Sequence, residues 1–171
     1  NDCLNRQWQT GTIQLDFQLP RNFNLKYTDS DGSEKTPVVI HRVIYGSLER
    51  FIGILIEHFA GAFPLWLSPV QTKIIPITDA QHEYAHKILD KLKEQGIRVE
   101  IDDRSEKMQS KIRDAQMQKI PYMLIIGGRE VENNQVSIRQ RDNQDLGAMD
   151  FDKFLKTIKD QIKNKSLNLI K

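Results

Sequence analysis

Two histidines one helical turn apart are the first residues that could do chemistry. Residues 81–87 read QHEYAHK, so His82, Glu83 and His86 match the H-E-x-x-H pattern of zinc enzymes. On a helical wheel with about 100° per residue, both histidines lie far from the apolar face of this segment. A catalytic zinc needs a shielded site and a third protein ligand. We therefore expect two solvent-exposed histidines rather than a metalloprotease site.

A second candidate is Arg50, near the start of the almost wholly apolar segment 47–61. Burying a guanidinium is costly unless an anion meets it. Two alternatives follow from the residues alone. Arg50 could form a structural ion pair with Glu49 or Glu57, or its planar fork could bind a polyphosphate.

The strand expected over residues 11–17 favours the phosphate alternative. Its alternation places Thr12 and Gln14 on one polar face. Gln9 falls on the other face unless the glycine of this strand introduces a bulge. His41 lies in a second apolar strand, where a lone histidine is usually a satisfied core residue.

The whole chain sets limits on these sites. It has 171 residues, 39% of them hydrophobic, a net charge of +2 and one cysteine. Such a chain suits one medium or two small domains and excludes a disulfide framework or a cysteine-rich zinc cluster. It shows no leader and no apolar run near membrane-spanning length, so we expect a soluble, cytoplasmic protein without membrane contact. Because it begins at Asn1, we expect a piece of a longer protein.

The first third of the chain predicts strands and one helix. The turn at Asp29–Lys35 carries Asp-Gly at its tip and predicts a hairpin between FNLKY and PVVIHRVIY. Ser47 is a candidate N-cap of the next helix, and Gly61 a candidate stop. Because this helix is apolar almost all the way round, we expect it to be buried.

After a linker ending near Pro69, strands and helices alternate. This order predicts an α/β fold with a mixed, mostly parallel sheet. The expected strands cover 72–77, 97–102, 122–127 and 134–141, and the expected helices cover 80–94, 106–118 and 150–164.

Several segments in the same order carry a family resemblance. RQWQTGTIQLDFQLP, PVVIHRVIYGSLERFIGILIEHFAGAFPLWLSPVQ and GIRVEIDDRSEKMQSKIRDAQMQKIPYMLIIGGREVENNQVSIRQR resemble bacterial-type threonyl-tRNA synthetases, which are class II enzymes. The resemblance implies that residues 1–68 are the end of an antiparallel-sheet catalytic domain. It implies that residues 69–171 are an α/β anticodon-binding domain, and that the chain is the carboxy-terminal portion of the enzyme.

The resemblance also implies roles for the residues of the first part. Arg50 would be the catalytic arginine that contacts the phosphates of Mg²⁺-bound ATP, and His41 would be one of three zinc ligands that hold threonine. The other two zinc ligands and the homodimer contacts would lie upstream. One departure is Thr10, where the family commonly has cysteine. The ATP and threonine pocket would be lined by Gln9, Thr12, Gln14, Ser47 and Arg50.

In the second part, the resemblance implies a site for the anticodon of threonine tRNA. On the helix expected over 106–118, Met108, Ile112 and Ala115 form the core face, and two lysines point outward. From the residues alone, such charges are more often a solvated surface. By resemblance, Glu130 and Arg139 would read bases, while polar and phosphate contacts would come from Ser105, Lys107 and Lys111.

The sequence therefore predicts a threonine–tRNA ligase whose present portion binds tRNA and is inactive alone. The alternative from another class is a non-catalytic RNA-binding module or regulator. A prolyl-type synthetase is a further alternative, which His41 disfavours because its use is in a zinc-chelating pocket.

Overall fold

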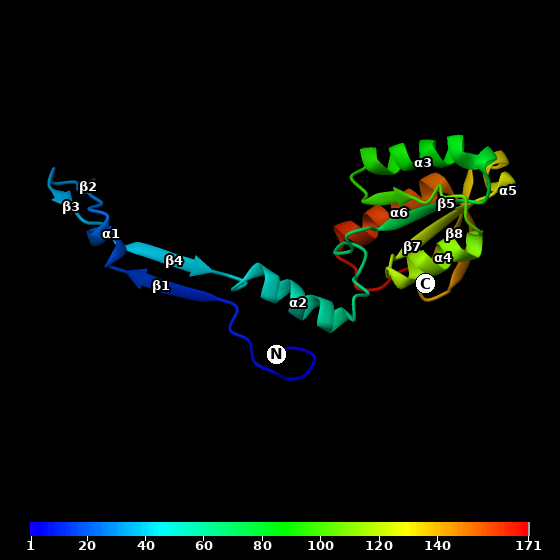
Figure 1. Cartoon of the computed structure of the whole chain (residues 1–171). Helices are drawn as coiled ribbons and strands as arrows, with labels where there is room; N and C mark the ends of the chain where they lie inside the picture. The colour runs from blue at the N-terminus through cyan, green and yellow to red at the C-terminus, as the bar shows by residue number, and fades with distance from the viewer. Residues whose placement is uncertain (171) are drawn as a thin grey trace. The chain divides into compact units, whose positions relative to one another are not determined.

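A computed structural model describes residues 1–170, which form two compact units (Figure 1). The first unit is Asn1–Phe59, and the second begins at Ala60. Among the described residues, no helix has the length and apolar character needed to cross a bilayer.

The first unit consists of two small antiparallel pairs and one longer helix. The predicted hairpin turn forms, with Gly32 at a φ of +79° and its amide donating to the carbonyl of Asp29. The hairpin is short because PVVIHRVIY pairs with the strand at residues 12–16 instead. The elements are β1 (Thr12–Asp16) paired with β4 (Val39–Val43), α1 (Leu19–Asn22), β2 (Tyr27–Thr28) paired with β3 (Glu34–Lys35), and α2 (Leu48–Phe59).

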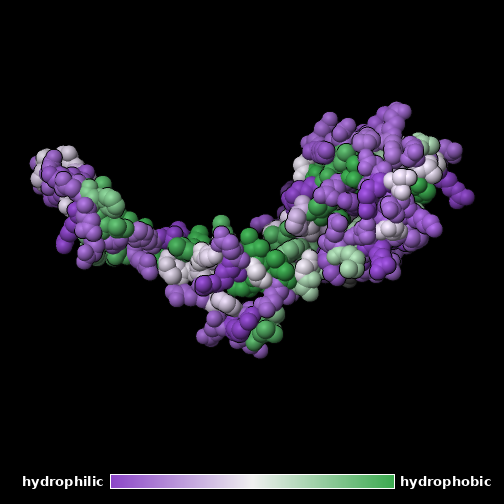
Figure 2. Space-filling model, viewed as in Figure 1, coloured by the Kyte–Doolittle hydropathy of each residue, from purple (hydrophilic) through white to green (hydrophobic). Residues whose placement is uncertain are grey.

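The expectation that this helix is buried was wrong for the chain as it stands. No residue of α2 is buried, and Ile52 is 51% exposed. Within the first unit only Asp2 and Pro20 are buried. Two strand pairs and one helix do not form a second layer that could cover the apolar faces. Figure 2 shows hydrophobic residues at the surface of this unit. The exposed large hydrophobic residues include Ile13, Leu15, Ile40, Leu48, Ile52 and Ile56.

The second unit is built on a five-stranded mixed sheet with the order β6-β5-β7-β8-β9. The mixed α/β fold is confirmed; β5 runs parallel to β6 and β7, while β8 runs antiparallel to β7 and β9. Parallel pairs are thus half of the pairings rather than most. The strands are β5 (Thr72–Pro76), β6 (Val99–Ile101), β7 (Tyr122–Ile126), β8 (Gln135–Gln140) and β9 (Asp145–Asp150).

Helices cover the two faces of this sheet unequally. One face packs against α3 and α6 through Leu124 and Ile138, and the other packs against α4 through Ile75 and Met123. The sequence missed β9 and the short helix α5, which begins directly after β7. The helices are η1 (Asp79–Gln81), α3 (His82–Glu94), α4 (Met108–Met117), α5 (Gly128–Glu132) and α6 (Phe151–Lys163).

Candidate functional site

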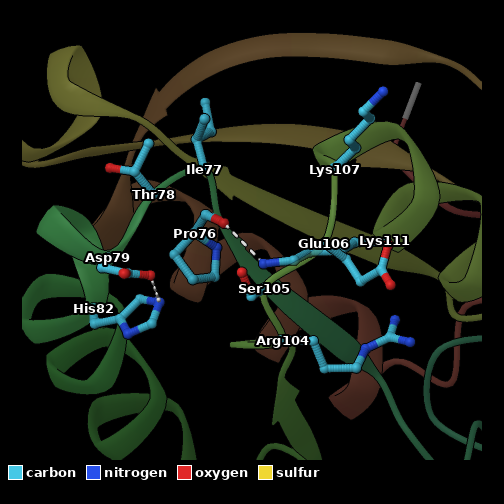
Figure 3. A pocket seen from close by; sticks show the side chains of 10 residues that line it. All are labelled: Pro76, Ile77, Thr78, Asp79, His82, Arg104, Ser105, Glu106, Lys107 and Lys111. Atoms are coloured by element: carbon cyan, nitrogen blue, oxygen red, sulfur yellow. Dashed lines mark hydrogen bonds and ion pairs between the residues drawn. The ribbon is translucent and has the colours of Figure 1, made fainter.

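A polar crevice opens at the carboxyl ends of β5 and β6 (Figure 3). Its volume is about 390 Å³. One wall follows β5 and carries Thr78, Asp79 and His82; the other follows β6 and carries Ser105 and Lys107. In open parallel sheets, ligands bind beyond the carboxyl ends of the strands, so the fold itself points to this crevice.

The β6–α4 loop that forms the second wall is organised by Asp102, which is 4% exposed. Its amide donates to the carbonyl of Ile74, 2.8 Å away. Its two carboxylate oxygens accept from Arg104 Nε and Nη2 at 2.8 and 2.7 Å, and the same Nη2 reaches Asp114 at 2.8 Å. The hydrogen bonds from Arg104 lower the pKa of Asp102, and Asp102 in turn raises the pKa of Arg104. This wall is therefore held rigidly by paired charges.

The two lysines of α4 lie differently from the sequence prediction. Lys107 is exposed at the N-cap, as expected. Lys111 was expected to point outward, but it is 3% exposed, and its Nζ donates to the carbonyls of Asp102 and Pro76 at 3.0 and 3.4 Å. Its spacing from Met108 and Ala115 places it on the apolar stripe, which the sequence analysis overlooked.

Glu130 lies beside the crevice at the end of the next strand. Its Oε2 accepts from the amide of Gly127 at 2.9 Å and so begins α5. A Cβ on Gly127 would come within 2.9 Å of this oxygen and 3.0 Å of Ile77 Cδ1. Ile77 lines the crevice, so Glu130 lies near one of its lining residues without lining it itself.

Arg139 lies on the part of the sheet that α4 leaves open. Burial alternates strictly along β8, with Ser137 and Arg139 partly exposed and Val136 and Ile138 buried. Arg139 Nη2 pairs with Asp145 Oδ2 across the sheet at 3.0 Å, and its hydrogen bond lowers the pKa of Asp145. The guanidinium is thus oriented yet accessible.

In the first unit, the polar face of β1 meets His41. Gln14 is the direct cross-strand partner of His41, and Thr12 lies opposite Val43 on the same face. The His41 Nε2 is 3.1 Å from Asp16 Oδ2. Asp16 also accepts from the amides of Leu19 and Gln18, which lowers its pKa. The sequence analysis had no role for Asp16, although its alternation with Thr12 and Gln14 placed it on this face.

Arg50 takes neither of the acidic partners considered from the sequence. Its guanidinium lies over the ring of Trp8, 5.7 Å from the centroid. Glu57 accepts instead from Arg6 at 2.7 Å, and Glu49 accepts from Ser47 Oγ at 2.7 Å. The end of the Arg50 side chain therefore has no acidic partner among the described residues, and its charge is available to an anion.

The start of α2 lies next to the segment before β1. Ser47 Oγ accepts from the Arg50 amide at 3.3 Å, which confirms the predicted N-cap. A Cβ on Gly46 would come within 3.7 Å of the Gln9 carbonyl. Gln9 precedes β1, so strand alternation does not place its side chain. Gln9, Ser47 and Arg50 thus belong to neighbouring segments.

The H-E-x-x-H histidines belong to α3. His86 is exposed, and His82 Nε2 is 3.6 Å from Asp79 Oδ1 at the rim of the crevice. Within residues 1–170, no three His, Cys, Asp or Glu side chains come together as metal ligands. The histidine pair therefore lacks the third ligand that a zinc site requires.

Comparison with known proteins identifies the second unit. The family model for the anticodon binding domain matches residues 71–161, which is more than half of the chain. The chain belongs to the anticodon-binding domain family. A second model, the tRNA synthetase class II core domain (G, H, P, S and T), matches residues 1–59.

Relatives of known function extend the similarity beyond the anticodon-binding domain. The chain is 57% identical over 164 residues to a threonine–tRNA ligase of Clostridium tetani, and 58% identical over 166 residues to one of Desulforamulus reducens. These matches cover 96% and 97% of this chain. The chain spans about a quarter of the relatives, 26% of their length.

Two solved structures resemble this chain in fold. The RNA-binding domain of the threonyl-tRNA synthetase from Cryptosporidium parvum is 38% identical, with a TM-score of 0.76 over 93% of this chain and 40% of that chain. Prolyl-tRNA synthetase from the same organism is 24% identical, with a TM-score of 0.64 over 92% of this chain and 35% of that chain, and shares the fold.

In this anticodon-binding domain, the residues expected to contact RNA are not one cluster. Ser105, Lys107 and Lys111 line the crevice, Glu130 lies near it without lining it, and Arg139 lies on the open sheet face. The sequence analysis missed Thr78 and Asp79, which form the opposite wall. They directly follow an expected strand, and the carboxyl-end rule for parallel sheets would have found them.

Proposed function

We propose that the chain is part of a threonine–tRNA ligase, comprising the anticodon-binding domain and a portion of the catalytic domain. The observation that carries this proposal is the 57–58% identity to threonine–tRNA ligases across both units. The whole enzyme would act in the cytoplasm as a homodimer. It would activate threonine with Mg²⁺-bound ATP and then esterify threonine tRNA.

The anticodon would be read from unstacked bases rather than from a duplex. Glu130 can accept hydrogen bonds from base amino groups, and Arg139 can donate to base carbonyl or ring nitrogen atoms. Ser105 and Lys107 add a hydroxyl and a charge for the sugar-phosphate backbone. The held positions of Asp102 and Arg104 support this role, because a fixed wall loses little entropy when RNA binds.

In the catalytic portion, Arg50 would stabilise the charge of the ATP phosphates by electrostatics rather than by proton transfer. Its accessible guanidinium over Trp8 supports this role. Gln9, Thr12, Gln14 and Ser47 would line the pocket for ATP and threonine. We place no acid–base residue here.

The surroundings of His41 are compatible with a role as a zinc ligand. Its Nε2 faces Asp16, and a carboxylate on one ring nitrogen orients the imidazole so that the other nitrogen can bind a metal. Bound zinc would supply open positions for the amino and hydroxyl groups of threonine, which the isosteric valine cannot match. The remaining ligands are not among the described residues.

RNA binding by the 171-residue chain tests the proposal. The fluorescence anisotropy of a labelled threonine anticodon stem-loop should report tighter binding than that of a stem-loop with a scrambled anticodon. Arg139→Ala should weaken cognate binding by about 1–3 kcal/mol, the contribution of one base contact. Lys156→Ala, an exposed charge on α6, is the matched control. Equal affinity for both loops would refute the anticodon role.

The catalytic assignment predicts a negative result for the chain alone. Threonine-dependent exchange of pyrophosphate into ATP should stay at background, because one imidazole and one arginine do not complete the site. The same assay on the longer natural protein should give exchange that Arg50→Ala reduces at least about a hundredfold. Robust exchange by the chain alone would contradict the proposed division of the site.

A further inference from the structure

Lys111 is a charged side chain on the core face of α4. It is 3% exposed and lies beside Ile112 and Ala115, which pack against the sheet. Burying an ammonium costs free energy unless its hydrogen bonds are made. Its burial therefore requires hydrogen-bond partners for the ammonium, which a solvent-exposed lysine would not need.

The ammonium lies where β5 and β6 separate. The last pair of their ladder joins Ile74 to Ile101, and the Asp102 amide then donates to the Ile74 carbonyl at 2.8 Å. Beyond this point the strands diverge into the two walls of the crevice. Lys111 Nζ bridges them, since it donates to the Pro76 carbonyl on β5 and to the Asp102 carbonyl on the β6 side.

The same site balances the charge of Lys111. Asp102 is bound mainly by Arg104, and the nearby ammonium of Lys111 contributes further to the lowered pKa of this carboxylate. Figure 3 shows Lys111 extending between the lining residues toward Pro76, with Ser105 close to the end of its side chain. The side chain thus connects both walls.

We propose that Lys111 is a positioning residue, whose buried ammonium sets the spacing between the carboxyl end of β5 and the loop that carries Ser105 and Lys107. It acts on RNA recognition through these walls rather than by contacting phosphate itself. The importance of this spacing for RNA rests on the function proposed above; the bridging role does not.

Hydrogen exchange tests the bridging role without RNA. In Lys111→Met the stem still packs but the carbonyls of Asp102 and Pro76 lose their donor, so amide exchange over residues 102–107 should accelerate about tenfold. The amides of α6 should be unchanged. Lys111→Arg, which keeps charge and donors, should restore slow exchange. Arg113→Met, which removes an exposed charge from the same helix, is the control.

Other outcomes of this experiment are equally informative. Unchanged exchange over 102–107 in a folded Lys111→Met variant overturns the bridging role. Where circular dichroism shows that Lys111→Met is unfolded, Lys111→Gln takes its place. Its shorter amide cannot reach both carbonyls, so the same local acceleration is expected, and unchanged exchange again overturns the role.

Salt-dependent RNA binding separates positioning from phosphate contact. Lys111→Met should weaken the cognate stem-loop about tenfold while leaving the scrambled loop and the salt dependence unchanged. Lys107→Met should lower the slope of log Kd against log salt by about one. Equal weakening of both loops with a lower slope in Lys111→Met would show a direct phosphate contact and overturn positioning.

The two proposals fail separately. Wild-type chain that does not distinguish the cognate from the scrambled loop refutes the anticodon role. The exchange rates over 102–107 then still decide whether Lys111 bridges the walls.

Discussion

At the scale of single residues, Tyr122 places one hydrogen-bonded hydroxyl group in the core of the second unit. The side chain is fully buried at the start of β7, and it packs edge-on against Phe154. Its hydroxyl donates to Gln161 Oε1 and accepts from the Ile170 amide, both at 2.8 Å. Burial raises the pKa of Tyr122 from 10.0 to about 12.

This shift predicts a pH dependence at the alkaline end. Between pH 10 and 12 the folded phenol keeps its proton while the unfolded phenol releases it, so the unfolded state binds fewer protons and stability falls as pH rises. The contribution of Tyr122 to the free energy of unfolding is complete below pH 10 and is lost as the pH rises through 12. Burial also raises the pKa of Tyr84, so the titration is made in a Tyr84→Phe background. The absorbance of tyrosinate should then show one late phenol that Tyr122→Phe removes and Tyr27→Phe leaves. A late step that survives Tyr122→Phe would contradict the assignment.

At the scale of elements, helix α6 is stabilised by Asp150, the residue that caps its N-terminus. Asp150 was predicted to start this helix, and its Oδ1 accepts from the Lys153 amide at 3.1 Å. Asp150→Ala should lower the free energy of unfolding by about 1 kcal/mol, measured by urea denaturation. Asp152→Ala removes an acidic residue from the same first turn without removing the cap. A similar loss in both variants would show that charge, not capping, is responsible.

For helix α2 we expect substitutions to have little effect on stability, because its apolar residues are exposed. Ile52 and Ile56 are 51% and 48% exposed. The double variant Ile52→Lys plus Ile56→Lys should change the stability of the chain by no more than about 0.5 kcal/mol and should reduce aggregation and dye binding. A large loss of stability would mean that these residues are covered in solution.

The elements also show what the sequence could and could not predict. The alternation of strands and helices along the chain identified β5 and β7, and the Asp-Gly tip identified the hairpin, because these signals are read from short stretches of sequence. The length of that hairpin was not predictable from the turn, because the sequence does not say whether β4 pairs across the turn or with β1. In the structure it pairs with β1. Lys111 was predicted to be exposed because lysine is charged, although its spacing from Met108 and Ala115 places it on the buried face of α4. The partner of Arg50 stayed open from the sequence, because its contact with Trp8 depends on tertiary structure.

At the scale of the whole molecule, the second unit begins before the anticodon-binding family match. Leu65 is 1% exposed in the core of the second unit. Arg98 donates to the carbonyls of Trp66 and Ser68, both at 2.9 Å. The domain boundary between residues 68 and 69 that the sequence indicates stays a prediction. The contacts of Leu65, Trp66 and Ser68 suggest how to test it.

Truncation provides that test. A chain of residues 60–171 should unfold with nearly the stability of the full chain, because the first unit has almost no buried side chains. A chain of residues 69–171 should lose about 2–5 kcal/mol, the cost of removing one large core side chain. Leu65→Ala in the full chain should reproduce much of this loss. Equal stability of the two truncated chains would favour the boundary at 68/69.

The alternating burial along β8 has a consequence for how this domain can change over generations. Val136 and Ile138 are fixed by the core, whereas Ser137 and Arg139 face outward from the same strand. Under the proposed role of Arg139, substitutions at the outward positions would alter which RNA is bound without repacking the interior. The fold and the RNA specificity would then be free to change independently in evolution, because they depend on alternate residues of one strand.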